Sequence, residues 1–328
     1  MSDSANITDS AGSSVLGASF VNNHIRPVIL LVFALMAALL RVTPAEAVVV
    51  YQTGFETSEG YSTNADLVGQ NGWVGFGSGG NGITTGFLQR TGQQAYVGFA
   101  PPAANDASLF VYRSINQNAS QVQFSVTFAI IDSTTTNRDD LYWSVFNQHG
   151  DQLFTIDLDN EELRVYYYLD DNKDRTWSGL FFTNTTPNQL FISMNFASNL
   201  WSGTFNGASV ATNKPITTVG ASLNLGDIDA AWAVYDPAKP GNNFMVFDDY
   251  RISATVAPPQ LMVLALTNGV PALRVTGETN NRFAVEASTD LTSWLPLKTN
   301  VTTGGSFDYI DSSSVGLPNR LYRARWVP

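Results

Sequence analysis

The chain contains no cysteine among its 328 residues. This absence excludes disulfide bonds, thiol catalysis and zinc sites built from cysteine. Histidine is nearly absent as well, since only His24 and His149 occur. Zinc enzymes usually need several histidine or carboxylate ligands, and a Ser-His-Asp arrangement needs a well-placed histidine. We therefore expect neither kind of catalytic site.

Positive charge is also scarce. Lysine and arginine together number 17, against 28 aspartate and glutamate residues, and the formal net charge is -11. Nucleic acids are recognised largely through phosphates, which need lysine and arginine. The composition therefore argues against a nucleic-acid partner, and it equally disfavours binding to an anionic membrane surface.

The chain has one long apolar run, Val28–Leu40. Its length suits the core of a signal peptide and falls short of the roughly 20 residues of a membrane-spanning helix. Arg26 precedes the run, and Ala45-Glu-Ala47 follows it as a cleavage motif. We predict a signal peptide over 1–47, cleavage after Ala47, and a secreted or cell-surface protein without a membrane insertion after cleavage. A buried core helix is the alternative. An exported chain without cysteine fits bacterial secretion best.

The remaining sequence has the pattern of a β protein. Hydrophobic residues make up 44% and aromatic residues 12% of the chain, which provides material for a large core. Strict alternation places one face of a predicted strand on Val122, Phe124, Val126, Phe128 and Ile130. No segment of useful length has a helical period. We predict an all-β fold: a two-sheet antiparallel jelly-roll sandwich over 48–256, followed by a second, smaller β-sandwich.

A stiff connector, Ala257-Pro-Pro-Gln260, separates the two predicted modules. The smaller module, 261–328, contains six short strand-like segments: Leu261–Leu266, Ala272–Val275, Phe283–Ala287, Trp294–Lys298, Phe307–Ile310 and Leu321–Arg325.

Two hairpins can be paired from the sequence in the middle of the larger module. A turn at His149-Gly150 sets Trp143 opposite Ile156, with Val145 opposite Phe154 and Leu141 opposite Leu158. A second turn at Asn160-Glu161 sets Leu158 opposite Leu163, Ile156 opposite Val165 and Asp157 opposite Arg164. Alternation then puts one common set on the other side of the sheet: Tyr142, Ser144, Phe146, Leu153, Thr155, Asp157, Asp159, Arg164, Tyr166 and Tyr168.

Four aromatic residues on three strands, with few charges, are unusual for the exposed side of a sheet. We interpret this side as a glycan-binding face, where aromatic rings contact sugar rings and polar groups bond hydroxyls. The ligand-binding candidates are Tyr142, Asp157, Arg164, Tyr166 and Tyr168, with Trp73 and Trp177 as second choices. The alternatives are that other parts of the chain cover this face, or that it binds another surface protein in a structural or adhesive role.

The order of several phrases resembles a known family. These are YQTGFETSEGYS (Tyr51–Ser62), GQNGWVGFG (Gly69–Gly77), GQQAYVGFA (Gly92–Ala100), QLFISMNFASNLWSGTFNGASVA (Gln189–Ala211) and the closing FMVFDDYRIS (Phe244–Ser253). They resemble the concanavalin A-like, laminin-G-like jelly rolls of secreted bacterial proteins. The resemblance implies two antiparallel sheets with the first and last strands side by side, and a family that includes lectins, glucanases, lyases and adhesive modules. The final segment, Arg282–Pro328, resembles a small immunoglobulin- or fibronectin-like module.

The resemblance also suggests a structural calcium ion, because some family members hold one near the closing strand. Glu56, Asp248 and Asp249 are the candidate ligands, together with backbone carbonyls. The alternative is that one of the two aspartates bonds backbone amides or pairs with Arg251.

Glycoside hydrolysis is the enzymatic alternative. Family glucanases carry Glu-x-Asp-x-Glu on a central strand, and the nearest match is Asp157-Leu-Asp159-Asn-Glu161. It departs from the motif at its first residue and at Asn160, and Glu161 falls in a predicted turn. We therefore expect a non-catalytic glycan-binding protein, with Asp157, Asp159 and Glu161 as weak catalytic candidates.

Overall fold

The computed structural model describes residues 47–89, 91–100, 102–103, 106–171, 173–317 and 319–328. The predicted signal peptide lies outside the described residues except for Ala47. Strands dominate the described chain, and its helices are three short 3-10 turns, η1 Thr57–Glu59, η2 Thr303–Gly305 and η3 Ser312–Ser314. Within this described part, we find no helix with the length and apolarity that a membrane crossing requires.

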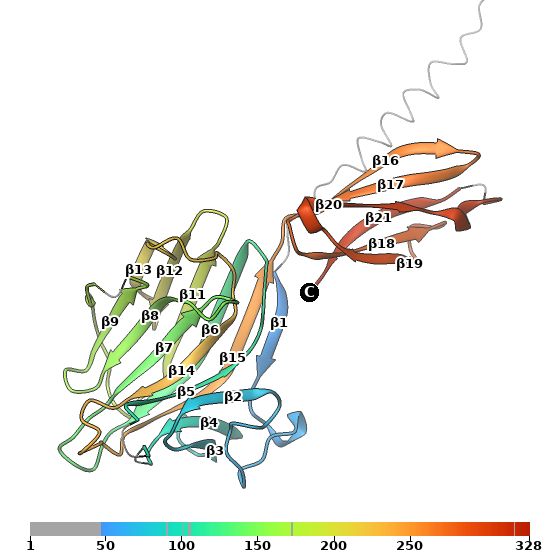
Figure 1. Cartoon of the computed structure of the whole chain (residues 1–328). Coiled ribbons are helices and arrows are strands. Elements are labelled where there is room, and N and C mark those ends of the chain that lie inside the picture. Colours follow the sequence, from blue (N-terminus) through green and yellow to red (C-terminus); the bar gives the residue numbers. More distant parts are fainter. Residues whose placement is uncertain (1–46, 90, 101, 104–105, 172, 318) are drawn as a thin grey trace, which may run out of the picture. The chain divides into compact units, whose positions relative to one another are not determined.

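The larger module consists of two antiparallel sheets (Figure 1). Sheet A has eight strands: β13 Ala208–Pro215, β12 Leu200–Phe205, β11 Asn188–Asn195, β6 Gln121–Ile131, β15 Phe244–Thr255, β4 Gln93–Gly98 and β3 Asn81–Thr85 in spatial order, with β1 Val48–Thr53 also paired to β15. Sheet B has seven: β10 Thr176–Phe181, β9 Arg164–Leu169, β8 Gln152–Asp159, β7 Asp140–Phe146, β14 Asp227–Ala233, β5 Ser108–Arg113 and β2 Trp73–Gly77.

The core between the sheets follows the alternation seen in the sequence. All five alternating residues predicted on one face of β6 are buried: Val122, Phe124, Val126, Phe128 and Ile130. Aromatic rings form much of this core, and Trp143 of β7 lies 5.4 Å from Phe247 of β15 and 5.4 Å from Phe124, centroid to centroid. The predicted all-β sandwich is confirmed.

The first and last strands of this module lie together, as expected, because β1 pairs with β15. β15 carries a β-bulge at Asp248 and Asp249, where the pairing with β6 shifts by one residue. The extra residue lets Phe247 and Tyr250, three positions apart, both reach the core, and both are fully buried. Asp249 takes the left-handed backbone conformation at this point (φ 51°). The bulge therefore explains how two adjacent aspartates fit into a closing strand.

The two central hairpins have the predicted faces but only one has the predicted register. Leu141, Trp143 and Val145 pair with Leu158, Ile156 and Phe154, as the sequence predicted.

The second pairing was wrong by two residues. Leu158 pairs with Val165 rather than Leu163, and Asp157 pairs with Tyr166, so that Arg164 lies opposite Asp159. The reason is a longer turn, which contains Leu163 in the left-handed conformation (φ 55°) and is closed by a 2.7 Å bond from the Glu162 amide to the Asp159 carboxylate. A shift of two residues keeps every side chain on its predicted side.

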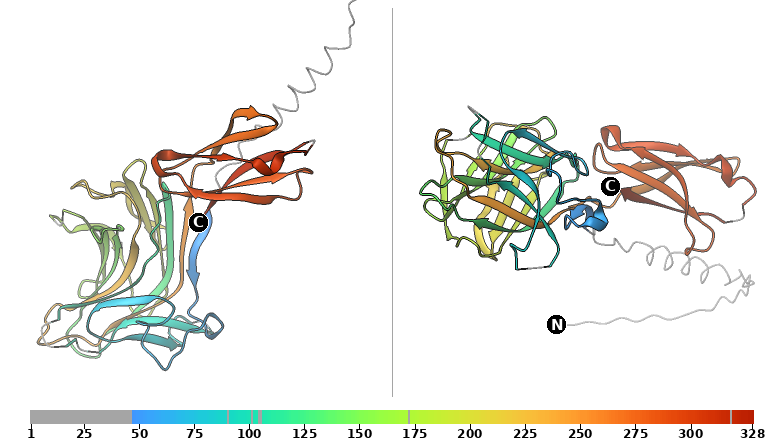
Figure 2. Two further views of the ribbon diagram at one scale, coloured as in Figure 1. Left: turned by 45° about the vertical axis from the view of Figure 1, so that its right-hand side comes forward. Right: turned by 90° about the horizontal axis from the view of Figure 1, so that it is seen from below.

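The smaller module contains the six predicted strands, arranged in two three-stranded sheets (Figure 2). One sheet is β16 Gln260–Thr267, β17 Val270–Thr276 and β20 Ser306–Ile310; the other is β19 Leu295–Val301, β18 Arg282–Ser288 and β21 Leu321–Val327. Leu273, Val275, Phe283 and Val285 are fully buried. The predicted boundaries at 256 and 261, and the immunoglobulin-like assignment, stay predictions.

Candidate functional site

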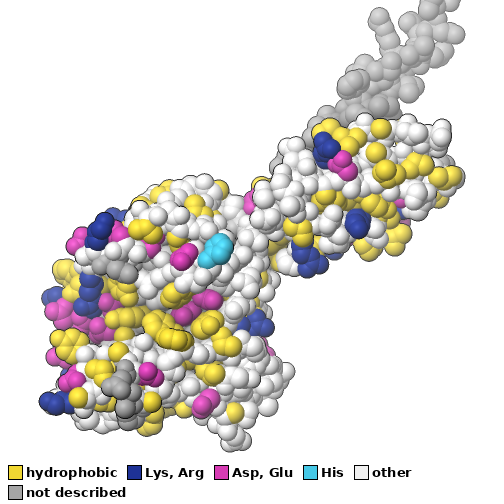
Figure 3. Space-filling model, viewed as in Figure 1, with side chains coloured by type: hydrophobic (Ala, Val, Ile, Leu, Met, Phe, Trp, Pro, Cys, Tyr) yellow, Lys and Arg dark blue, Asp and Glu magenta, His cyan; other side chains and the backbone are white. Residues whose placement is uncertain are grey.

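The outer face of sheet B, which is the side turned away from the core, carries most candidate residues. In the view of Figure 3, hydrophobic and acidic side chains lie next to one another on the larger module. A cavity of about 580 Å³ opens where β7 begins and β8 ends. Its lining residues come from these strands, from β9 and from four loops: Thr136, Asn137, Arg138, Asp139, Asp140, Asp159, Glu161, Glu162, Tyr166, Arg175, Tyr235, Asp236 and Lys239.

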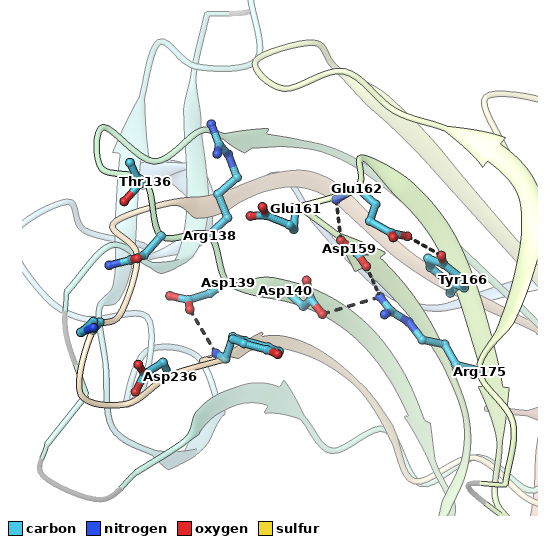
Figure 4. A pocket seen from close by; sticks show the side chains of 13 residues that line it. Thr136, Arg138, Asp139, Asp140, Asp159, Glu161, Glu162, Tyr166, Arg175 and Asp236 are labelled. Carbon is cyan, nitrogen blue, oxygen red and sulfur yellow. Dashed lines mark hydrogen bonds and ion pairs between the residues drawn. The ribbon is translucent and has the colours of Figure 1, made fainter.

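Arg175 is the centre of this site (Figure 4). Its Nε lies 2.7 Å from Oδ2 of Asp157, and its Nη2 lies 2.8 Å from Oδ2 of Asp159 and 3.6 Å from Oδ2 of Asp140. The guanidinium carbon lies 4.0 Å from the ring centroid of Tyr166. One arginine thus binds three carboxyl groups and stacks on a tyrosine, which fixes the positions of these side chains.

Two of the three carboxyl groups around Arg175, those of Asp140 and Asp157, have pKa values above the ordinary value of an aspartate. Burial, followed by the nearby charges of Asp157 and Asp159, raises the pKa of Asp140 to about 7. Burial also raises the pKa of Asp157 to about 6, and Arg175 opposes that rise. Three carboxylates around one cation repel one another, and protonation of Asp140 or Asp157 relieves this repulsion.

A second group of contacts lies at the β9–β10 edge of the cavity. The Tyr166 hydroxyl donates a 2.6 Å hydrogen bond to Glu162, and Arg164 forms a 2.9 Å ion pair with the same carboxylate. The Arg164 guanidinium lies over the Trp177 ring at 5.0 Å. Trp177 is 46% exposed, and it packs against Phe181 with 5.6 Å between ring centroids. Two of the predicted binding residues, Arg164 and Tyr166, are therefore held in place beside an open aromatic edge.

The other predicted residues lie beside or beneath the cavity. Tyr142 and Tyr168 are half-buried and pack edge-to-face on each other, 6.2 Å apart, and neither lines the cavity. The side chain of Asp157 is only 3% exposed and serves to hold Arg175. Trp73, a second choice from the sequence, is completely buried in the core.

Three important residues were missed in the sequence. Arg175 follows an acidic stretch that reads as a solvated loop, and nothing local indicates that it folds back onto β8. Asp140 precedes the predicted strand, so it was not counted with the outer face. Tyr235 lies in the loop after β14 and is 88% exposed at the cavity. The exposure of Tyr235 cannot be predicted from the sequence, because it depends on where the fold places this loop.

The three weak catalytic candidates lie near the same cavity, but two of them are already paired with Arg175. Asp157 and Asp159 point from β8 to the same arginine, whereas Glu161 lies exposed in the following turn and lines the cavity.

The proposed calcium ligands Glu56, Asp248 and Asp249 do not form a metal-binding arrangement. Glu56 accepts a hydrogen bond from the Gln93 amide at 3.3 Å, and Asp249 accepts one from the Thr127 hydroxyl at 3.0 Å. Oδ1 of Asp248 accepts the Asp249 amide at 2.7 Å. Among the described residues, no group of three or more histidine, cysteine or acidic side chains is arranged to hold a metal ion. Glu56 and Asp248 accept hydrogen bonds from backbone amides, and Asp249 accepts one from a hydroxyl. For Asp248 this agrees with the alternative that one of the two aspartates bonds backbone amides.

Comparison with known proteins gives structural likenesses only. No family model and no curated protein matches the sequence. Similar solved structures include a sialidase (8% identity, TM-score 0.43), of whose chain this protein spans 18% while 57% of this chain is covered. Others are the cellulose induced protein Cip1 (13%, 0.41, 62% of this chain and 96% of that one) and arcelin-5, a lectin-like defense protein from Phaseolus vulgaris (8%, 0.39, 57% and 94%). At these identities and scores the likenesses assign no function, and the jelly-roll arrangement rests on the sheet topology.

Proposed function

We propose that the larger module binds a glycan in the cavity around Arg175, outside the cell and without catalysis. The observation that carries the proposal is the combination of paired charges with accessible aromatic rings. Arg175 is paired with aspartates, and Arg164 is paired with a glutamate. Three aromatic residues lie around these ion pairs: Tyr166, Trp177 and Tyr235. A ligand there meets oriented donors and acceptors next to apolar ring faces, which suits a polyhydroxylated molecule.

The charge balance of the lining narrows the ligand class. Six carboxyl groups face three cations, namely Asp139, Asp140, Asp159, Glu161, Glu162 and Asp236 against Arg138, Arg175 and Lys239. This acidic excess repels uronates, sialic acids and phosphates, because like charges close together are costly to bring in. The proposed ligand is therefore neutral or cationic.

A glycan array probed with the purified protein tests this function. We expect binding to uncharged oligosaccharides, weakened at least tenfold by Tyr235→Ala or Tyr166→Ala. Phe191→Ala is the matched control, because Phe191 is 39% exposed on sheet A and lies on a different face. A blank array combined with self-association in light scattering would favour the adhesive alternative instead.

Glycoside hydrolysis stays a second candidate because of one observation. Asp140, whose pKa is raised to about 7, and Asp159 both contact Nη2 of Arg175, and two neighbouring carboxyl groups, one of them able to hold a proton near neutral pH, resemble an acid–base pair. Release of reducing sugar from laminarin, abolished by Asp140→Asn or Glu161→Gln, would establish it. Unaltered laminarin with measurable binding would exclude it.

A further inference from the structure

A second cavity of about 340 Å³ lies on the same outer face of sheet B. It is lined by Phe76 of β2, Phe110 and Tyr112 of β5, Phe146 of β7, Gly150 of the following turn, and Asp227 and Asp229 of β14. Asp140, at the first cavity, and Phe146, at the second, are the two ends of β7. They are six positions apart on the strand, a separation of about 20 Å. One extended ligand could therefore contact both cavities.

The floor of the second cavity is a pair of carboxyl groups. Asp227 and Asp229 are two positions apart on β14 and so share one face. They hydrogen-bond to each other, which requires one shared proton, and burial raises the pKa of both. Asp229 is 5% exposed, and its buried Oδ1 has no hydrogen-bond partner among the described residues. This oxygen is an acceptor that still lacks a donor.

The walls are apolar and supply no positive charge. Phe76 is 74% exposed, and the other rings are half-buried. Two tyrosines lie near enough to be affected by the pair: burial, followed by the charges of Asp227 and Asp229, raises the pKa of Tyr112 of β5 and of Tyr250 of β15 in sheet A. His149 and Asp151 flank Gly150 in the turn. The first cavity differs, because three cations, Arg138, Arg175 and Lys239, lie among its carboxyl groups. In the second cavity a ligand must supply the positive charge itself, or the carboxyl pair keeps its proton.

The chemistry of the lining selects an organic ammonium group. A calcium ion wants six to eight oxygen ligands, which two carboxyl groups between phenylalanine rings do not provide. An anion would meet two acidic groups. An ammonium group offers up to three N–H donors, one of which can reach the unpartnered Oδ1, and its charge is attracted to aromatic ring faces.

We propose that this second cavity binds a primary ammonium group, and that the glycan recognised by the larger module carries it as an unacetylated amino sugar. The second clause rests on the proposed glycan-binding function. When the ammonium binds, the shared proton leaves the carboxyl pair for the buffer, so that two carboxylates face one cation.

Calorimetric titration of the purified protein with a glucosamine hexamer and with its fully N-acetylated counterpart tests the proposal. We expect the free-amine oligomer to bind at least tenfold tighter, with proton release visible as a dependence of the heat on the buffer. Asp229→Asn should remove the preference and leave binding of the acetylated oligomer unchanged. Asp66→Asn, at an exposed aspartate elsewhere, is the matched control.

A second variant tests the same site in case the substitution of buried Asp229 disturbs folding. Phe76→Ala removes a largely exposed ring and should weaken the free-amine oligomer about threefold, as expected for loss of one cation–π contact. Val74→Ala on the same strand is its control.

The outcomes separate the two proposals. Equal binding of both oligomers, or a preference that survives Asp229→Asn and Phe76→Ala, overturns the ammonium site. If neutral oligosaccharides still bind and depend on Tyr166, the glycan-binding function stands without it. If butylammonium binds through Asp229 while every oligosaccharide fails, the ammonium site stands and the glycan function falls.

Discussion

At the scale of single residues, Arg175 determines the candidate site. It compensates the charge of Asp157 and Asp159, whose side chains are 3% and 8% exposed, and it also approaches Asp140. The pairing predicted from the sequence set Asp157 opposite Arg164, whereas its ionic partner in the structure is Arg175. Pairing between neighbouring strands can be predicted from a sequence, whereas the contact of Asp157 with an arginine in the loop between β9 and β10 cannot.

Replacing Arg175 with glutamine should therefore destabilise the protein, and more so at pH 8 than at pH 5. At pH 8 the aspartates are ionised and left without a counter-charge, while at pH 5 Asp140 and Asp157 take up protons, since their pKa values are about 7 and 6. We expect a loss of about 1–2 kcal/mol at pH 8, below the figure for a fully buried pair because Arg175 is 39% exposed. Urea unfolding measures it.

Lys173→Gln is the control for the arginine variant. Lys173 is 76% exposed, and its Nζ lies 3.7 Å from Oδ2 of Asp171. An Arg175→Gln penalty that is equal at both pH values would show that the three carboxyl groups do not depend on this cation.

At the scale of the strand, the strand register depends on the lengths of turns, which the sequence pattern did not predict. The alternation of side chains predicted the faces of β7, β8 and β9, and those faces are correct because a two-residue shift preserves them. The register of β8 and β9 depends on the number of residues in the turn. Leu163 has a left-handed backbone conformation, which cannot be predicted from the fact that it is a leucine.

The edge strand β10 contains a further irregularity, a register shift between Trp177 and Leu180. Gly179 lies in it with φ 85°, and a Cβ there would meet no atom within 4 Å. Gly179→Ala should then cost about 1–2 kcal/mol through backbone strain alone, because an L-residue avoids this conformation. Denaturant unfolding gives the value.

Gly54→Ala is the matched control, because Gly54 has no positive φ and its added Cβ would make only ordinary contacts, the nearest at 3.6 Å. Equal stability of the two alanine variants would contradict the strain assigned to Gly179.

At the scale of the whole molecule, buried acids should make stability depend on pH. The folded pKa values of Asp140 and Asp157 lie above the ordinary value of 3.8, and those of Asp227 and Asp229 are raised too. The folded state therefore binds more protons than the unfolded state between about pH 4 and pH 7, so stability falls as pH rises through that window.

We expect the free energy of unfolding to drop by on the order of 2 kcal/mol from pH 5 to pH 8, since one pKa unit is worth about 1.4 kcal/mol. Carboxyl groups with lowered pKa values, such as Asp132 and Glu286, act below this window. Asp140→Asn should flatten the slope. A constant or rising unfolding midpoint between pH 5 and pH 8 would contradict the burial of these acids.

The molecule as a whole also shows what a sequence can and cannot predict about function. Alternating apolar residues and turn signals were enough to predict two sandwiches and all six strands of the smaller module, since those features are local. The candidate site draws on β7, β8, β9 and four loops, some of them far apart in the chain. Only the fold brings Asp140, Arg175 and Tyr235 together.

The central claim is that the cavity around Arg175 binds sugars through its tyrosines, and one titration tests it most directly. The strongest oligosaccharide from a glycan array is titrated calorimetrically into the wild-type protein, into the Tyr166→Ala/Tyr235→Ala double variant and into Phe191→Ala. We expect saturable binding that the double variant weakens by at least tenfold and that Phe191→Ala leaves intact. Equal affinity of all three proteins would contradict the claim.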